Sequence, residues 1–197
     1  MENRATELAE KIWVTKGARF NAHRRLNGRH YSSLTATALM SVYVVFLQLV
    51  PALAPANTLR IDAGALTLLT AFLAMAILVL SIVEQGRSYQ LRAERLHQCG
   101  MALNELYDEF ENRRMQAAQT LPALLDDVSA RYHTILRSVP ENHDPIDNVL
   151  FRAQHRERFN VGMMSALTTH VKHAVITYGL SCALIVGFPI VAVIWFI

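Results

Sequence analysis

Long uncharged stretches alternate with charged segments along this chain. Three stretches lack Asp, Glu, Lys, Arg and His entirely: residues 31–59, 63–83 and 174–197. Each contains at least about 20 residues, the length of apolar helix that crosses about 30 Å of hydrocarbon. The pattern predicts an all-α integral membrane protein with an N-terminal two-helix transmembrane hairpin, a helical hairpin or bundle, and a C-terminal transmembrane helix.

The same pattern divides the chain into four segments. We predict an amphipathic helix in residues 1–30, a two-span hairpin in 31–84, a helical region in 85–172 and a third span in 173–197. In the first segment Leu8, Ile12 and Trp13 share one side of a basic helix that we expect to end near Asn27-Gly28. Such a helix either lies on the inner leaflet or packs on the helical region, and both alternatives stay open.

Two heptad patterns mark residues 85–172. The first contains Leu96, Cys99, Leu103, Leu106 and Phe110, and the second contains Leu121, Leu125, Val128, Tyr132, Ile135 and Val139. Apolar residues spaced by threes and fours form seams for helix pairing. We predict an antiparallel hairpin, broken near 116–122 and reinforced by a third helix or by oligomerisation. Alternatively each seam meets another subunit, so Leu96, Leu103, Leu106, Phe110, Leu125 and Tyr132 are candidate oligomer or regulatory contacts.

Residues 138–147 carry the densest turn signal. Asp144 precedes Pro145, a combination that starts helices because the carboxylate caps free amides and proline loses no bond at the first position. Asp147 adds a favourable charge to the first turn. We predict a helix from Pro145 that continues into the third span. Asn142, His143, Asp144 and Asp147 are regulatory candidates, and a metal site of the last three is a weaker alternative.

Polar side chains interrupt the first span on one face. Thr37, Ser41 and Gln48 are four and seven residues apart, so they align along a helix. Inside a bilayer such residues face protein or water. They form either a seam between helices or the lining of a water-filled passage, which makes them pore-lining candidates.

Small residues mark faces of the other two spans. In the second span Gly64, Thr67 and Ala71 lie along a stripe that we expect to pack on the first span. In the third, Gly179, Ala183 and Gly187 repeat every fourth residue. Small residues let helices approach closely in membranes, so both sets are helix-packing candidates.

Lys and Arg are shared unequally between the two sides of the spans. Seven precede the first span, only Arg60 lies in the expected outer turn at 54–62, and the rest lie between the second and third spans. The positive-inside rule places the N-terminus and residues 84–172 in the cytoplasm and the C-terminus outside. Since the charge flanks spans, we expect lipid and not nucleic acid as its partner. His170 and His173, with Lys172 between them, lie where the third span enters the membrane, and we expect them to contact head groups, with pH sensing as the alternative.

Motifs for catalysis and for cofactors are missing from the sequence. It contains no GxxxxGK[ST], GxSxG, HExxH or dinucleotide fingerprint. Cys99 and Cys182 lie in different segments, which argues against a disulfide or a metal site. We therefore expect no enzyme, no cofactor and no metal. If a nucleotide binds, the candidate phosphate contacts are Arg113, Arg114, Arg131, Arg137, Arg152, Arg156 and Arg158.

Three segments together resemble a known family. They are ARFNAHRRL at 18–26, YHTIL at 132–136 and ENHDPID at 141–147, which leads into Phe151-Arg152. In this order they are similar to SLATT proteins, the SMODS- and SLOG-associating two-transmembrane effectors. The third span departs from the two-span description and leaves open which helix lines a pore.

The resemblance implies a role in bacterial conflict systems. SLATT proteins are similar to effectors coded beside nucleotide-signal synthetases, SLOG sensors or reverse transcriptases, so it implies such a neighbour, or a nucleotide messenger, as partner. It further implies a homo-oligomeric pore that disrupts the inner membrane and stops phage spread. The alternative is a non-conducting membrane anchor that recruits a soluble enzyme through the helical seams.

Overall fold

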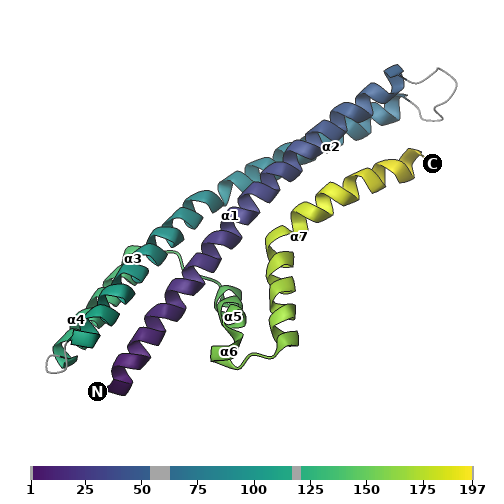
Figure 1. The fold of residues 1–197 in the computed structure, drawn as a ribbon. Helices are drawn as coiled ribbons and strands as arrows, with labels where there is room; N and C mark the ends of the chain where they lie inside the picture. Colours follow the sequence, from purple (N-terminus) through teal and green to yellow (C-terminus); the bar gives the residue numbers. More distant parts are fainter. Residues whose placement is uncertain (1, 54–62, 117–120, 197) are drawn as a thin grey trace. The chain divides into compact units, whose positions relative to one another are not determined.

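Helices are the only regular secondary structure in the part of the chain that the structure describes. The computed structural model describes residues 2–53, 63–116 and 121–196, so the expected outer turn at 54–62 lies outside the described residues. The helices are α1 (Glu2–Leu53), α2 (Ala63–Gly86), α3 (Tyr89–Gln116), α4 (Leu121–Ser138), α5 (Pro145–Gln154), α6 (Arg156–Phe159) and α7 (Met163–Phe196) (Figure 1). Three helical stretches, in Glu2–Leu49, Gly64–Gln116 and Met163–Ile190, are long and apolar enough to cross a membrane. The predicted all-α membrane fold is confirmed.

The chain forms two compact units, each built from segments distant in sequence. The first unit contains Met1–Asn27 and Gln90–Ala174, and the second contains Gly28–Tyr89 and Val175–Ile197. All three uncharged stretches belong to the second unit apart from Ala174. The first unit joins the N-terminal segment to the charged helical region.

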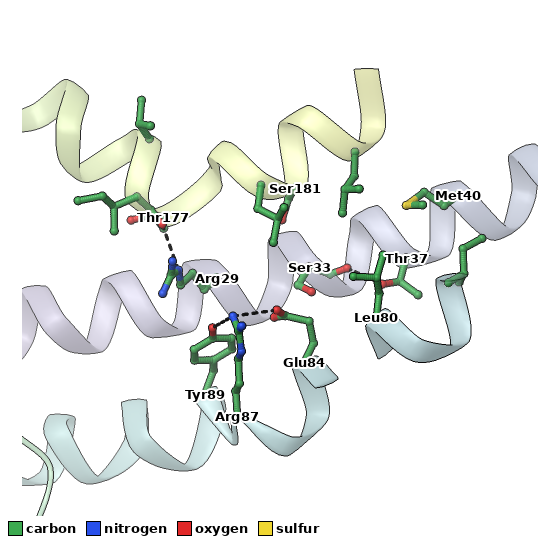
Figure 2. A pocket seen from close by; sticks show the side chains of 15 residues that line it. Arg29, Ser33, Thr37, Met40, Leu80, Glu84, Arg87, Tyr89, Thr177 and Ser181 are labelled. Carbon is green, nitrogen blue, oxygen red and sulfur yellow. Dashed lines mark hydrogen bonds and ion pairs between the residues drawn. The ribbon is translucent and has the colours of Figure 1, made fainter. Parts of the chain in front are cut away.

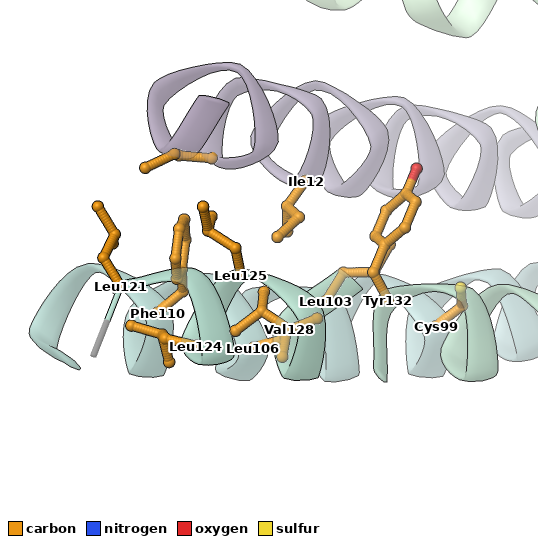
Figure 3. Close-up of a cluster of buried hydrophobic side chains, with 12 residues drawn as sticks. Ile12, Cys99, Leu103, Leu106, Phe110, Leu121, Leu124, Leu125, Val128 and Tyr132 are labelled. Carbon is orange, nitrogen blue, oxygen red and sulfur yellow. The ribbon is translucent and has the colours of Figure 1, made fainter. Parts of the chain in front are cut away.

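Both heptad seams lie in one hydrophobic core of the first unit (Figure 3). Leu103 and Phe110 of α3 have no exposed surface, and Leu125 and Val128 of α4 are 2% and 1% exposed. Because the two seams share one core within a single chain, the predicted helical hairpin is confirmed. The same chain covers these side chains, which leaves them no surface for contact with another subunit.

The N-terminal part of α1 completes this core. Ala5, Ala9 and Ile12 are buried against the residues of α3 and α4. The hydroxyls of Thr15 and Tyr132 are 3.0 Å apart, which ties α1 to α4 directly. Of the two alternatives for this segment, packing on the helical region is therefore correct. The N-terminal part of α1 therefore reinforces the two seams.

α1 does not end at Asn27-Gly28, so that prediction is wrong. The helix continues without interruption to Leu53. Within the second unit, a Cβ at Gly28 would lie 2.9 Å from Thr177 Cγ2 and from the Tyr178 hydroxyl oxygen. Glycine here permits close approach of α7 instead of ending the helix.

The predicted continuous helix from Pro145 into the third span is also wrong. α5 ends at Gln154, and α7 begins only at Met163. Between them His155 has φ −113° and ψ 44°, and Asn160 has a left-handed φ of 51°. Asn adopts this conformation more readily than most residues, so it reverses the chain at low cost.

Trp13 of α1 packs on residues before and after His155, in α5 and α6. Its ring meets Phe151 edge-on at 4.7 Å between centroids and stacks on Phe159 at 5.9 Å. The Arg158 guanidinium carbon lies 4.4 Å from the Trp13 ring centroid. Aromatic contacts to α1 therefore hold α6 folded back, which local sequence signals did not reveal.

In the second unit, α1 and α2 pack through apolar residues and not through small ones. Met40, Val44 and Ile77 form a buried cluster, with Leu73, Leu184 and Phe188 packed against it. The stripe predicted to face the first span is exposed in all three members, Gly64, Thr67 and Ala71. That prediction is wrong because the larger residues of α2 bury more apolar surface on the opposite stripe.

The small residues of α7 lack a packing partner among the described residues. A Cβ on Gly187 would meet nothing within 4 Å, and one on Gly179 would meet only Val175 of the same helix. Ala183 is exposed. Their role in helix packing stays a prediction.

Candidate functional site

A buried pair of opposite charges lies in the first unit, between α1 and the start of α5. The side chains of Arg25 and Asp147 are 4% and 0% exposed. Arg25 Nε donates to Asp147 Oδ1 at 2.9 Å, and Nη2 donates to Oδ2 at 3.0 Å. Two parallel hydrogen bonds to one carboxylate are strong and fix the relative orientation of the two groups. The pair therefore sets how α1 meets α5.

The Asp147 carboxylate also completes the cap of α5. Asp144 is the N-cap residue, as predicted. Its main-chain N–H donates to Asp147 Oδ2 at 2.9 Å, and the Asp147 N–H donates to the Asp144 carbonyl at 2.9 Å. Arg25 Nη2 lies 2.6 Å from Asp144 Oδ2. One arginine thus holds both acidic residues of the helix start.

His173 of α7 faces the same carboxylate. Its Nε2 atom lies 3.7 Å from Asp147 Oδ1, and its side chain is 15% exposed. The prediction that His173 contacts lipid head groups is therefore wrong. Burial raises the pKa of the Asp147 carboxyl, but the nearby His173 ring and the hydrogen bonds and charge of Arg25 together lower it more, so this pKa lies below its ordinary value. Asp147 is ionised at neutral pH.

Side chains of α1 and α3 hold the turn that precedes α5. Arg19 Nη1 donates to the Glu141 carbonyl, and Arg95 Nη1 donates to the Glu141 carboxylate at 2.8 Å. Asn21 Nδ2 donates to the Asp147 carbonyl at 3.2 Å. Burial, followed by the charge of Arg19, lowers the pKa of His143, which keeps its ring neutral at pH 7.

Two of the three segments that suggested a family therefore meet at this cluster, 18–26 and 141–147. A sequence profile for SMODS and SLOG-associating 2TM effector domain family 5 matches residues 1–195. The chain belongs to this family. Curated proteins gave no match, and solved structures gave none.

Membership makes this SLATT protein a membrane effector of conflict systems. The matched range also includes the third apolar helix, although the family is described as having two transmembrane helices. The additional span is thus part of the region that defines this family.

The pore-lining candidates do not form one site within a single chain. Gln48 Nε2 donates to Thr70 Oγ1 of α2 at 3.0 Å, which makes a hydrogen bond between helices. Thr37 and Ser41 donate to carbonyls four residues earlier in α1. Thr37 lines a cavity of the second unit (Figure 2), whereas Ser41 and Gln48 are exposed. Their place in a pore stays a prediction.

Several candidate phosphate contacts are paired with acids. Arg131 binds both Glu109 oxygens, at 2.9 and 2.7 Å, and Arg114 lies 2.8 Å from Glu2. Asn142 accepts the His143 main-chain N–H at 2.9 Å. Over the described ranges, no group of three or more His, Cys, Asp and Glu side chains is placed to hold a metal ion.

Sequence reasoning missed Arg25, Asn21 and Arg19 as site residues. One signal was present for Arg25, which shares a helix face with Ala18 and Ala22 at spacings of seven and three residues. A single cation on a face of small residues that packs against other helices indicates a buried ion pair. The partner could not be inferred, since Asp147 lies 122 residues further along the chain.

Proposed function

We propose that this SLATT protein assembles into a homo-oligomeric pore that disrupts the bacterial inner membrane when triggered, with the first unit in the cytoplasm. One observation carries the proposal: Ser41 and Gln48 are exposed on the apolar part of α1. Polar side chains in a bilayer face protein or water and avoid lipid. Assembly of several copies removes them from lipid, either against another helix or along an aqueous path.

In this proposal the activating signal acts on the first unit. α1 and α7 each contribute residues to both units, so a change in how the first unit holds these helices acts on the spans. A signal from a neighbouring synthetase, SLOG sensor or reverse transcriptase, or a nucleotide messenger, would shift a packing equilibrium of this kind.

The alternative function, a membrane anchor, needs an exposed surface that binds a soluble enzyme. It relied on the helical seams to bind a soluble enzyme, and Leu103 and Phe110 are fully buried within the chain. A recruiting role would need another face of the first unit.

Membrane potential tests the proposal. Cells express the protein with and without its genomic neighbour while a dye reports the potential. We expect depolarisation and growth arrest that depend on the trigger. Unchanged potential together with co-purification of the neighbour would instead establish the anchor.

A substitution at Gln48 asks whether this stripe lines the pore. If it does, Gln48→Leu makes the passage harder to wet and lowers single-channel conductance while oligomer size stays unchanged. Thr70→Val is the matched control, because it removes the same 3.0 Å hydrogen bond from the buried partner. If the bond only joins α1 to α2, both variants weaken the association of these helices by about 1 kcal/mol and leave the conductance of each channel unchanged.

A further inference from the structure

A cavity of about 200 Å³ lies within the second unit (Figure 2). Its lining comes from α1, α7, α2 and the turn that leads into α3. Apolar walls are formed by Met40, Ile77, Leu80, Val175 and Leu184. Arg29, Glu84, Arg87 and Tyr89 lie together away from Met40, as Figure 2 shows. The cavity is therefore amphipathic, with a charged end and an apolar end.

The charged end has an excess of positive charge. Arg29 Nε donates to the Ile176 carbonyl at 3.0 Å, and its guanidinium lies 5.7 Å from the Tyr89 ring centroid. Arg87 binds the Tyr89 hydroxyl at 2.8 Å and Glu84 at 3.3 Å. Among the described residues no carboxylate pairs with Arg29. Two guanidinium groups and one carboxylate leave a net charge of +1 at this end.

The sequence places this end where the apolar stretches stop. Arg29 precedes the stretch 31–59 by two residues, and Glu84 directly follows the stretch 63–83. In a membrane, these positions lie at the level of lipid phosphates. Met40 is 11 residues beyond Arg29, about 16 Å along a helix, which is within the hydrocarbon.

We propose that this cavity binds one anionic phospholipid, with its phosphate at Arg29 and Arg87 and an acyl chain along Met40, Ile77 and Leu184. Basic pockets between membrane helices bind anionic head groups in this way. At about 200 Å³, the cavity is smaller than the roughly 300–1,000 Å³ of common ligand sites, so it holds the first part of the chain only. The excess positive charge favours a net anionic head group over a zwitterionic one.

Native mass spectrometry of the full-length protein tests this proposal. The protein is extracted from nanodiscs of phosphatidylglycerol or of phosphatidylcholine, and retained lipids are counted. We expect selective retention of phosphatidylglycerol. Arg29→Gln should weaken it about fivefold to tenfold, the effect of losing one charged contact near a membrane surface. Arg24→Gln, an exposed α1 residue of the first unit, is the matched control and should change nothing.

A second variant guards against misfolding of Arg29→Gln. Leu80→Trp fills the apolar end and should reduce retention with the arginines intact, whereas Leu78→Trp on the exposed side of α2 should not. Equal retention of both lipids, or unchanged retention in Arg29→Gln and Leu80→Trp alike, overturns the proposal. Full displacement of the lipid by inorganic phosphate also overturns it, because that result describes a free-anion site. Conductance is not measured, so the outcome is independent of the proposed pore.

Discussion

Arg25 and Asp147 illustrate how a buried ion pair trades stability for orientation. Removing two charges from water costs several kcal/mol per ion, and mutual attraction roughly offsets that cost only when the geometry is good and the remaining polar atoms are bonded. Here the carboxylate receives two bonds from Arg25 and one from the Asp144 amide. A hydrophobic pair would fill the same space without specifying how α1 meets α5.

Removing one partner should therefore be far worse than removing both. Asp147→Asn leaves the buried Arg25 charge with only the exposed Asp144 carboxylate as its partner and should lower the free energy of unfolding by about 3–5 kcal/mol. The double variant Arg25→Met/Asp147→Leu should lower it much less. Urea unfolding in detergent, followed by Trp13 fluorescence in a Trp195→Phe background, measures both.

An exposed pair provides the control for this experiment. Arg131→Gln breaks the contact with Glu109 on the surface and should cost less than about 1 kcal/mol. A similar small loss in Asp147→Asn would show that water reaches the cluster.

Acid should destabilise the first unit in two steps. The folded chain holds the pKa of His143 below its unfolded value of about 6.5, so the unfolded state binds more protons between the two values. The free energy of unfolding then falls as pH drops from 7 towards 5. Asp147, whose pKa is also lowered, contributes a further loss only below about pH 4.

His143→Gln isolates the first step. The variant removes the proton that residue 143 binds on unfolding. The urea concentration at the unfolding midpoint should therefore change less between pH 7 and pH 5 than in the parent chain. The loss below pH 4 should persist. An unchanged slope between pH 7 and 5 would assign that step to other histidines.

Helices were predictable where their signals are local. The heptads of α3 and α4 repeat in sequence, and Asp144-Pro145 announces the start of α5, so these elements could be predicted. Gly28 was misread because its role depends on α7, which approaches it only in the folded chain. The break at His155 and Asn160 likewise depends on distant Trp13. Long-range contacts of this kind leave no local periodicity.

The helix start at α5 offers a direct measure of one local signal. Asp144→Ala should lower the free energy of unfolding by about 1 kcal/mol, and Asp144→Asn should cost less because Asn caps equally well. The contact with Arg25 adds little, since the Asp144 side chain is 61% exposed. A large and equal loss of function in both variants with unchanged unfolding would indicate ligand binding instead.

Across the whole molecule, three apolar helices are long enough to cross a membrane, and their charged flanks predict an orientation. Membrane character followed from the sequence because it depends on composition over about 20 residues. The division into two units did not, because each unit combines segments from both sides of the hairpin. The predicted orientation rests on the unequal distribution of Lys and Arg.

That orientation can be measured with fusions. A reporter that is active only in the cytoplasm, joined after Ile197, should be inactive, whereas the same reporter before Met1 should be active. The paired fusions control for expression level. Activity at the C-terminal fusion would contradict a third span that crosses fully.

The separation between Arg25 and Asp147 has a consequence for biosynthesis. These residues are 122 positions apart, and a bacterial ribosome adds roughly 5–20 residues per second, so Arg25 waits about 6 to 24 seconds for its partner. Arg25 precedes the two-span hairpin and Asp147 follows it, so both must leave the ribosome before the ion pair can form. A nascent chain whose first two spans are already in the membrane therefore still lacks a folded first unit. That unit can fold only after translation has continued well beyond the hairpin.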